Sequence, residues 1–281
     1  GKSLNGRELM AIRLNTTARG MEPSSKPGIV FLGTHHAREH LSTEVPFLLV
    51  KHLIENRSKP EVAKLLATRD VYFIPLVNPD GAEYDIDGDI YHMHRKNMRG
   101  NANGSIGVDL NRNYGFHWGE GGASPSPNSD TYRGPAPFSE PESQAVKAFV
   151  ESRKNLKILL SYHTYSELIL YPWGHSYNPL PDANALSAYK AMAQKMASWT
   201  GYTPQQSSQL YIASGDTTDW AWGELGIFSF TFELTPKSWG NGGFYPGAAA
   251  IASTFQTNIK PALYLIDMAE DPYRAAAAPA L

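Results

Sequence analysis

The chain has 281 residues, of which 42% are hydrophobic and 19% charged, and its formal net charge is −2. This is the composition of a globular protein long enough for one sizeable domain. The near-neutral balance gives no sign of the basic surface that is typical of nucleic-acid binding, and no apolar stretch reaches the length of about 18 residues that spans a bilayer. Cysteine is absent, so any metal site has histidine and carboxylate as its ligands.

The pattern of apolar residues predicts strands that alternate with helices along the chain. We expect strands at 8–14, 28–34, 71–77, 156–163 and 227–234, and the second is nearly all apolar and therefore central. We expect helices at 41–56, 61–68, 139–154, 183–200, 215–225 and 247–270. This alternation, without a linker or an internal repeat, indicates a single α/β domain with a central mixed, mostly parallel, twisted sheet and helices on both faces.

Two local signals and one long segment interrupt this pattern. Asn78-Pro-Asp-Gly81 predicts a turn, and Ser139-Glu-Pro-Glu142 has the spacing of a capping box at a helix start. Residues 82–138 between them are polar but rich in aromatic and Arg residues, which favours a functional loop. Within this loop, Asp85 to Asp89 lacks the Gly and final Glu of an EF-hand, so we interpret it as a polar turn.

Three candidate metal ligands follow apolar runs. His36 and Glu39 come after the run 28–33, and His163 ends the run 156–162. A catalytic zinc takes three nitrogen or oxygen ligands and leaves one position open for water. Ligands three positions apart can point the same way from a turn, and the third comes from a distant strand. Each residue alone is compatible with a purely structural role, and His35 and His40 are rival ligands, His35 more so.

Glu233 ends an alternating strand, 229–233, whose other positions are largely apolar. A carboxylate there must be solvated in a cleft, paired, or bound to a metal. Beside an activated water it would act as a general base and pass its proton to the leaving amine. A structural salt bridge is the alternative.

Asp109-Leu-Asn-Arg-Asn113 closes the long polar segment. Arg112 can bind a carboxylate through two parallel hydrogen bonds, with Asn111 donating beside it. Asp109 can hold the second nitrogen of a metal-bound histidine. The same five residues taken without context are equally typical of a turn.

Arg95 and Arg99 add two cations near this motif, suited to the oxyanion that develops when water attacks a carbonyl. A solvated basic loop is the alternative interpretation. Tyr211 lies in Ser207-Ser-Gln-Leu-Tyr-Ile-Ala-Ser-Gly215, a segment flexible enough to act as a lid. A packing role is the alternative for this tyrosine.

Taken together, these motifs resemble those of the zinc metallocarboxypeptidases of the carboxypeptidase A family, and especially its bacterial carboxypeptidase T branch. The resemblance rests on the sequences DLNRNYG at 109–115, TYRG at 131–134, HTYSELILYP at 163–172, GYTPQQ at 201–206 and FTFE at 230–233. The similarity extends from about residue 1 to residue 271. It implies a zinc-dependent exopeptidase with His36, Glu39 and His163 as ligands and Glu233 as general base and proton shuttle.

The resemblance also implies roles in substrate binding. Asn111 and Arg112 would clamp the substrate's C-terminal carboxylate, Tyr211 would close over it, and Arg38 would contact the residue before the scissile bond. The family's electrophilic arginine corresponds to Arg99 if the intervening Met is an insertion, and to Arg95 otherwise. We take Arg99 as the first choice.

A specificity pocket follows from the same alignment, and we expect it to be lined by Leu170, Gly174, Gln206, Leu210, Ala213, Asp216, Thr218 and Thr231. Relatives that prefer basic C-terminal residues carry Asp at the position of Thr218, and those that prefer apolar ones carry Ile. Asp216 can supply a carboxylate instead, so we expect a broad preference for apolar and aromatic residues with some Lys or Arg. The alignment also implies cis peptides before Tyr165 and Trp173, and between Thr235 and Pro236.

The resemblance sets expectations for the whole chain as well. Residues 1–271 would form the catalytic domain, without the first helix and strand of the family domain, and 272–281 a C-terminal tail. We expect a monomer secreted as a proenzyme, acting on peptide or protein C-termini, with no nucleic-acid or membrane partner. The alternatives are a peptidase of cell-wall peptides, an amide or ester deacylase, and a non-catalytic zinc-binding module.

Overall fold

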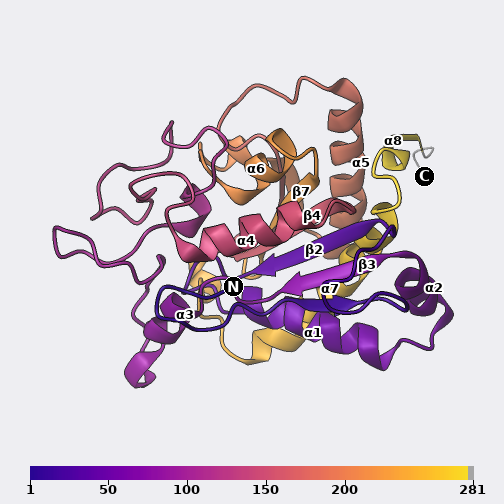
Figure 1. Cartoon of the computed structure of the whole chain (residues 1–281), viewed down its shortest axis with the longest axis horizontal. Helices are drawn as coiled ribbons and strands as arrows, with labels where there is room; N and C mark the ends of the chain where they lie inside the picture. Colours follow the sequence, from indigo (N-terminus) through magenta and orange to yellow (C-terminus); the bar gives the residue numbers. More distant parts are fainter. Residues whose placement is uncertain (278–281) are drawn as a thin grey trace.

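A seven-stranded mixed sheet forms the centre of the computed structural model, which describes residues 1–277 (Figure 1). The strands are β1 (Ile12–Leu14), β2 (Gly28–Gly33), β3 (Asp70–Ile74), β4 (Leu156–Thr164), β5 (Leu168–Tyr171), β6 (Thr203–Gln206) and β7 (Phe228–Leu234). Their order is β1-β3-β2-β4-β7-β5-β6. The pairs β1/β3 and β5/β7 are antiparallel and the others are parallel.

Helices cover both faces of this sheet, as predicted. They are α1 (Leu41–Glu55), α2 (Pro60–Thr68), α3 (Pro79–Asp85), α4 (Pro141–Ser152), α5 (Ala183–Thr200), α6 (Thr217–Gly223), α7 (Ala249–Met268) and α8 (Arg274–Ala277). In β2, Ile29 and Phe31 pack into a core with α1, α2, α5 and α7, while Val30 and Leu32 pack into a second core with α4 and α6. Since successive side chains of a strand point to opposite faces, an all-apolar strand is buried on both sides.

The structure differs from the predicted elements in several places. Strands β5 and β6 were not predicted, because each has four residues and β6 is polar. The expected turn at 78–81 opens α3, since the side chain of Asn78 accepts a hydrogen bond from the backbone N–H of Gly81. The capping box is wrong: α4 starts after Glu140 without a side-chain cap, and Glu142 accepts from the backbone N–H of Leu4 instead.

The sheet brings the predicted site residues together at one edge. Strands β2, β4 and β7 are parallel neighbours, and His163 lies directly opposite Glu233 in the register of β4 and β7. The carboxyl ends of parallel strands meet at the same edge, where open α/β sheets bind ligands. The segment 86–140, which contains only short 3₁₀ turns between α3 and α4, lies at this end of the strands (Figure 1).

The remaining boundaries concern the ends of the chain. In the predicted tail 272–281, α8 occupies Arg274–Ala277, and 278–281 lie outside the described residues. The extent of the catalytic domain, 1–271, stays a prediction. Among the helices of residues 1–277, none combines the length and the apolar character needed to cross a bilayer.

Candidate metal centre and active site

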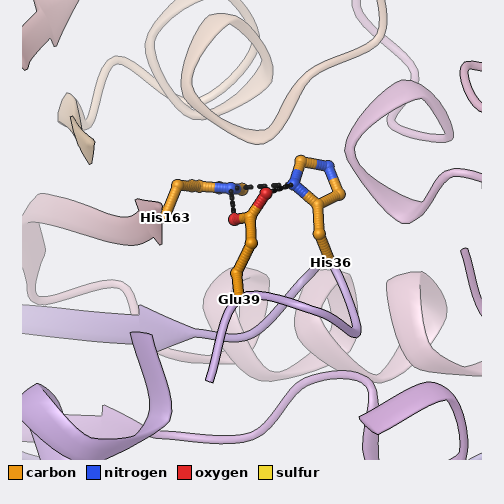
Figure 2. Close-up of side chains that lie close together, drawn as sticks. All are labelled: His36, Glu39 and His163. Atoms are coloured by element: carbon orange, nitrogen blue, oxygen red, sulfur yellow. Dashed lines mark hydrogen bonds and ion pairs between the residues drawn. The ribbon is translucent and has the colours of Figure 1, made fainter. Parts of the chain in front are cut away.

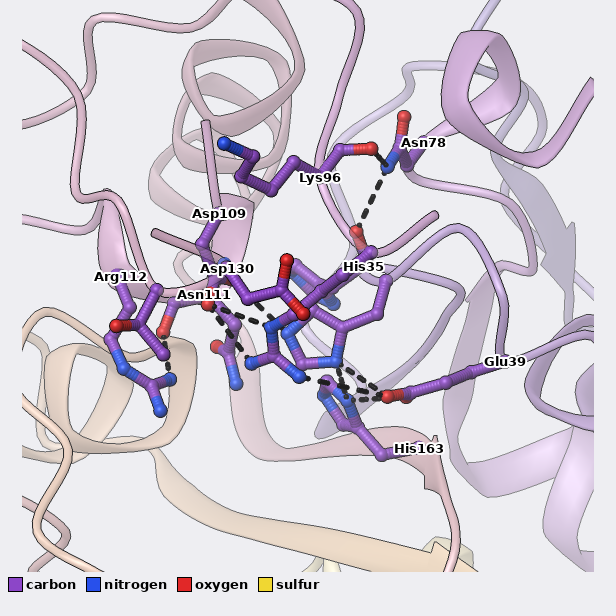
Figure 3. A network of polar contacts seen from close by, with 12 residues as sticks. His35, Glu39, Asn78, Lys96, Asp109, Asn111, Arg112, Asp130 and His163 are labelled. Atoms are coloured by element: carbon purple, nitrogen blue, oxygen red, sulfur yellow. Dashed lines mark hydrogen bonds and ion pairs between the residues drawn. The ribbon is translucent and has the colours of Figure 1, made fainter. Parts of the chain in front are cut away.

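A tight turn between β2 and α1 presents the first two candidate ligands. The backbone N–H of Glu39 donates to the carbonyl of His36 at 3.2 Å, and that of Ala37 donates to the carbonyl of Arg95 at 3.0 Å. Asn78 adds a second connection between these segments, because its Nδ2 donates to the carbonyls of His35 and Lys96 (Figure 3). The turn is therefore fixed before any ligand binds.

His36, Glu39 and His163 converge on one point from this turn and from β4 (Figure 2). Nδ1 of His36 lies 2.8 Å from Oε1 of Glu39, and Nδ1 of His163 lies 3.0 Å from Oε2 of Glu39 and 3.1 Å from Nδ1 of His36. All three side chains are buried. Two imidazole nitrogens and one carboxylate at this separation form the donor set of a catalytic zinc site, so the residues present fit the metal.

The other nitrogen of each histidine has a partner of its own. Nε2 of His36 lies 3.2 Å from Oδ1 of Asp109, and Nε2 of His163 lies 3.0 Å from Oγ of Ser161. Such contacts fix the ring orientation and leave Nδ1 for the metal. The contact predicted for Asp109 is present in the structure. Ser161 was missed, although it lies two positions before His163 in a strand and must share its face.

The two rival histidines point elsewhere. Nε2 of His35 lies 2.8 Å from the hydroxyl of Tyr114, and Nε2 of His40 lies 2.8 Å from Oδ2 of Asp85. Burial, and the positive charge that His163 and His36 can carry, keep the pKa of His35 well below its ordinary value. His35 is thus a neutral hydrogen-bonding residue behind the cluster.

The buried carboxylates near the cluster are held ionised. Burial alone would raise the pKa of Glu39, but the charges of His36 and His163 and their hydrogen bonds outweigh it and lower that pKa. For Asp109, burial is likewise outweighed, first by Arg95 and then by His36, so its pKa stays well below the usual range. Both groups are therefore anionic and suited to a metal centre.

Glu233 lines the cavity in front of the ligands. This cavity, of about 240 Å³, is also lined by His36, Glu39, Arg95 and Tyr211. Burial and then the negative charge of Glu39 raise the pKa of Glu233 to about 8. A bound dication would bring this pKa down again, because it favours the charged form of a nearby carboxylate. A carboxyl group that titrates near neutral pH is suited to proton transfer.

The structure does not place Arg99 at this centre. Its Nε donates to Oε1 of Glu140 at 2.7 Å and its Nη2 to the carbonyl of Ser139 at 3.2 Å. Arg95, the second choice, takes the expected position: its Nε and Nη2 donate to Oδ2 of Asp109 at 3.0 and 2.9 Å, and its Nη1 lies 4.0 Å from Oε1 of Glu39. This placement favours the alignment without an insertion, and it makes Arg95 the candidate for the electrophilic role first assigned to Arg99.

The predicted carboxylate clamp lies beside the cluster (Figure 3). Oδ1 of Asn111 accepts hydrogen bonds from the backbone N–H and the hydroxyl of Thr217, both at 2.9 Å, which turns its amide nitrogen away from them. Arg112 uses Nε and Nη1 for the carbonyls of Gly122 and Asn111. Its guanidinium lies 5.7 Å from the ring centroid of Tyr211, which is 48% exposed. The exposed phenol thus lies over the clamp, where a lid would be.

Comparisons with known proteins agree with this geometry. The family model described as zinc carboxypeptidase matches residues 1–260. The chain belongs to the zinc carboxypeptidase family. A zinc carboxypeptidase of Saccharothrix mutabilis subsp. capreolus is 39% identical over 92% of this chain and 61% of its own length. Carboxypeptidase B of Astacus astacus is 33% identical over 97% of this chain and 89% of its own. The crystal structure of carboxypeptidase A from Helicoverpa armigera superposes with a TM-score of 0.83 at 28% identity, covering 99% of this chain and 68% of that one.

Family membership confirms the resemblance drawn from the motifs, and zinc is the metal that it implies for the His36, Glu39 and His163 cluster. The chain also has the cis peptide bonds that the alignment implied, at Thr164–Tyr165, Pro172–Trp173 and Thr235–Pro236.

A second cavity corresponds to the expected specificity pocket. It shares Leu210, Tyr211 and Glu233 with the metal cavity and is lined further by Asn111, Arg112, Leu170, Gly174, Ser207, Ala213, Asp216, Thr218 and Thr231. Gln206 is not among the lining residues, which corrects its predicted place. Its Nε2 instead donates to the carbonyls of Ser176 and Asn178 at 2.8 and 3.1 Å, so Gln206 supports the loop behind the pocket.

Asp216 lines this pocket, and only one of its two carboxylate oxygens accepts hydrogen bonds from the described residues. Its Oδ1 accepts hydrogen bonds from the backbone N–H groups of Thr218 and Asp219 and from the hydroxyl of Thr218, at 2.9, 2.9 and 2.6 Å. Its Oδ2 is buried and has no hydrogen-bond partner among the described residues. Burial, and then the charge of Asp219, raise the pKa of Asp216 to about 7. An unpartnered oxygen at a pocket wall is available to a ligand's donor.

Arg38 lines a third and larger cavity of about 570 Å³, together with Arg95, Arg112 and Tyr211. Its Nη1 donates to the carbonyl of Met93 at 3.0 Å and approaches Oδ2 of Asp130 at 3.4 Å. The predicted binding residues Arg38, Asn111, Arg112 and Tyr211 are thus brought together around the metal cluster, and Arg99 is not.

Proposed function

We propose that this protein hydrolyses the C-terminal peptide bond of peptides and releases one amino acid at a time. One observation carries the proposal. The cavity lined by the candidate ligands His36 and Glu39 and the pocket lined by Asn111 and Arg112 share Leu210, Tyr211 and Glu233. A substrate whose terminal carboxylate is bound in the pocket therefore has its last peptide bond near the metal cluster.

The residues of the cluster and its surroundings suit hydrolysis. Zinc bound by His36, Glu39 and His163 would polarise the scissile carbonyl and make water easier to deprotonate. Glu233 takes the proton from the attacking water and delivers it to the leaving amine. Arg95, which is held by Asp109, places a positive charge where the oxyanion develops.

The carboxylate clamp, Asn111 and Arg112, determines that the last peptide bond of the substrate is the one cleaved. Arg112 offers a planar guanidinium and Asn111 an amide to a free carboxylate, a match that an internal peptide bond lacks. Closure of Tyr211 over the bound residue would exclude water from the pocket. The same requirement for a free carboxylate argues against a deacylase, and cell-wall peptides remain the alternative substrate within this chemistry.

For the released residue we propose a broad preference. Leu170, Leu210 and Ala213 supply apolar contacts, and the unpartnered Oδ2 of Asp216 supplies an acceptor for Lys or Arg. We also propose, from the family resemblance, a monomer that is secreted as a proenzyme and has neither nucleic acid nor membrane as a partner.

Release of free amino acid from N-blocked dipeptides ending in Leu, Phe, Arg or Glu tests the proposal. Two controls are needed. The first uses the same peptides with an amidated C-terminus, and the second uses protein treated with a chelator and then with zinc. We expect zinc-restored release from the free acids only. Glu233→Gln should slow this release at least about a hundredfold, whereas Glu151→Gln, which changes an acidic partner of Lys147 on α4, should not. Release from the amides, or no release by zinc-loaded folded protein, contradicts the proposal.

A further inference from the structure

Asp85, the last residue of α3, is a fully buried carboxylate that joins three segments near the active site. Its Oδ1 accepts a hydrogen bond from the backbone N–H of His94 at 2.7 Å, and its Oδ2 lies 2.8 Å from Nε2 of His40. The hydroxyl of Tyr245 donates to the same carboxylate, at 3.0 Å from Oδ1 and 2.9 Å from Oδ2. The metal centre and its clamp involve none of these contacts.

The first segment that Asp85 holds, Met93 to Arg95, contacts one candidate site arginine, Arg38, and includes another, Arg95. His94 lies between Met93, whose carbonyl accepts from Nη1 of Arg38 at 3.0 Å, and Arg95. The backbone of Arg95 in turn accepts from the N–H of Ala37, beside the ligand His36. The bond from His94 to Asp85 therefore fixes the stretch of chain that supports Arg38 and carries Arg95.

The second segment also contacts Arg38. Phe244 precedes Tyr245, and the Arg38 guanidinium lies 4.3 Å from the centroid of the Phe244 ring. Phe244 also packs edge-on against Tyr165 at 5.0 Å and lines the cavity with His36 and Glu39. The Tyr245 ring is stacked on Tyr91 at 3.8 Å, so the ring is packed independently of its hydroxyl.

Arg38 itself has capacity to bind a ligand. Its Nε is buried and has no hydrogen-bond partner among the described residues. A buried N–H without an acceptor is costly, and a peptide carbonyl in the cavity would satisfy it. Two of the groups that contact Arg38, the Met93 carbonyl and the Phe244 ring, belong to segments attached to the Asp85 carboxylate, whereas the third, Asp130, is 66% exposed.

We propose that Asp85 and Tyr245 are positioning residues for the part of the site that receives the peptide upstream of the scissile bond. They act through Arg38, which donates to a backbone carbonyl of that peptide, and through Phe244, against which an upstream side chain packs. The inference rests on the proposed exopeptidase function, because it assigns the direction from which the peptide enters. Its ligand class is an extended peptide of three or more residues.

Tyr245→Phe tests the proposal, since it removes the hydroxyl and keeps the stacked ring. The substrates are a blocked dipeptide and a blocked tetrapeptide that share their last two residues. We expect kcat/KM to fall about tenfold more for the tetrapeptide than for the dipeptide, mainly through KM, because a hydrogen bond to a buried charged group is among the stronger ones. In an Arg38→Ala background the same substitution should add less than about a further twofold.

Tyr273→Phe is the matched control. It also removes a tyrosine hydroxyl near an aspartate, Asp182, but its ring packs on Phe228 at the far end of β7 from Glu233. We expect this variant to leave the ratio of the two kcat/KM values unchanged. Thermal unfolding of both variants accompanies the kinetics.

Two results overturn the inference while the proposed function stands. Equal losses on both substrates in Tyr245→Phe would show a merely structural role, and unchanged kinetics on both would show that the hydroxyl positions nothing. A full Tyr245→Phe effect in the Arg38→Ala background would also contradict the route through Arg38. Absence of any amino-acid release by the zinc-loaded wild type is a different result, which removes the proposed function and the inference together.

Discussion

Replacing Asp109 by asparagine tests how far the metal cluster depends on a carboxylate that is not one of its ligands. Asp109 is fully buried. Its Oδ1 lies 3.2 Å from Nε2 of His36, and its Oδ2 accepts two hydrogen bonds from Arg95, at 3.0 and 2.9 Å. Asn has nearly the same size but lacks the negative charge that both partners face.

Two losses follow from this substitution. His36 loses the anionic acceptor that keeps its Nε2 protonated and its Nδ1 free, and loss of such a partner costs about 10- to 100-fold in metal affinity. Arg95, whose side chain is 10% exposed, retains Glu39 at 4.0 Å as a more distant acidic neighbour. Breaking a buried ion pair from one side costs ~3–5 kcal/mol, so we expect ~3 kcal/mol, the lower end, for the free energy of unfolding.

Competition with a chromophoric chelator measures the zinc affinity, and chemical denaturation measures the free energy of unfolding. Asp130→Asn is the control, because the Asp130 carboxylate is 66% exposed and lies 3.4 Å from Arg38. A folded Asp109→Asn protein with the wild-type zinc Kd would refute the reasoning, since His36 would then adopt the binding tautomer without the carboxylate.

Three further predictions concern the catalytic and specificity residues. Because burial raises the pKa of Asp216 to about 7, its carboxyl becomes charged as the pH rises through that value. The ratio of kcat/KM for substrates ending in arginine over leucine should therefore increase with pH, and a ratio that rises equally in Asp216→Asn would contradict this. Glu233→Gln should lower kcat about 10²- to 10⁴-fold while metal analysis still finds bound zinc; loss of the zinc would instead make Glu233 a ligand. Arg95→Ala should lower kcat about 10²- to 10³-fold, whereas Arg99→Ala, which breaks the Glu140 pair, should lower the melting temperature and leave kcat near that of the wild type. The reverse pattern would restore Arg99 as the electrophilic residue.

Sequence patterns located the parts of the site that depend on strand ends. Apolar runs predicted β2, β4 and β7, and polar residues that end such runs are brought to one edge of a parallel sheet. This argument alone placed His36, His163 and Glu233 near one another. The register of β4 and β7, with His163 opposite Glu233, is a detail that periodicity does not contain.

The sequence predicted the positions of loop residues less well, because the course of a loop depends on long-range contacts. The spacing of Arg95 and Arg99 led us to choose Arg99, but in the structure Asp109 binds Arg95 beside the cluster and Glu140 binds Arg99 elsewhere. The junction at Asp85 was interpreted as a polar turn for the same reason. Its partner Tyr245 lies 160 residues away in the chain.

The sequence by itself determined the α/β class, the ligand types and the edge of the sheet where they gather. The α/β class and the sheet edge follow from the short-range periodicity of apolar residues, which is a property of neighbouring residues. The ligand types follow from the absence of cysteine, which is a property of composition. Tertiary structure decided which ring nitrogen of His36 and His163 faces the cluster, which arginine lies beside it, and which groups contact Arg38. Each of these is set by a hydrogen bond or ion pair between buried groups far apart in sequence, where an unpaired charge is too costly to persist.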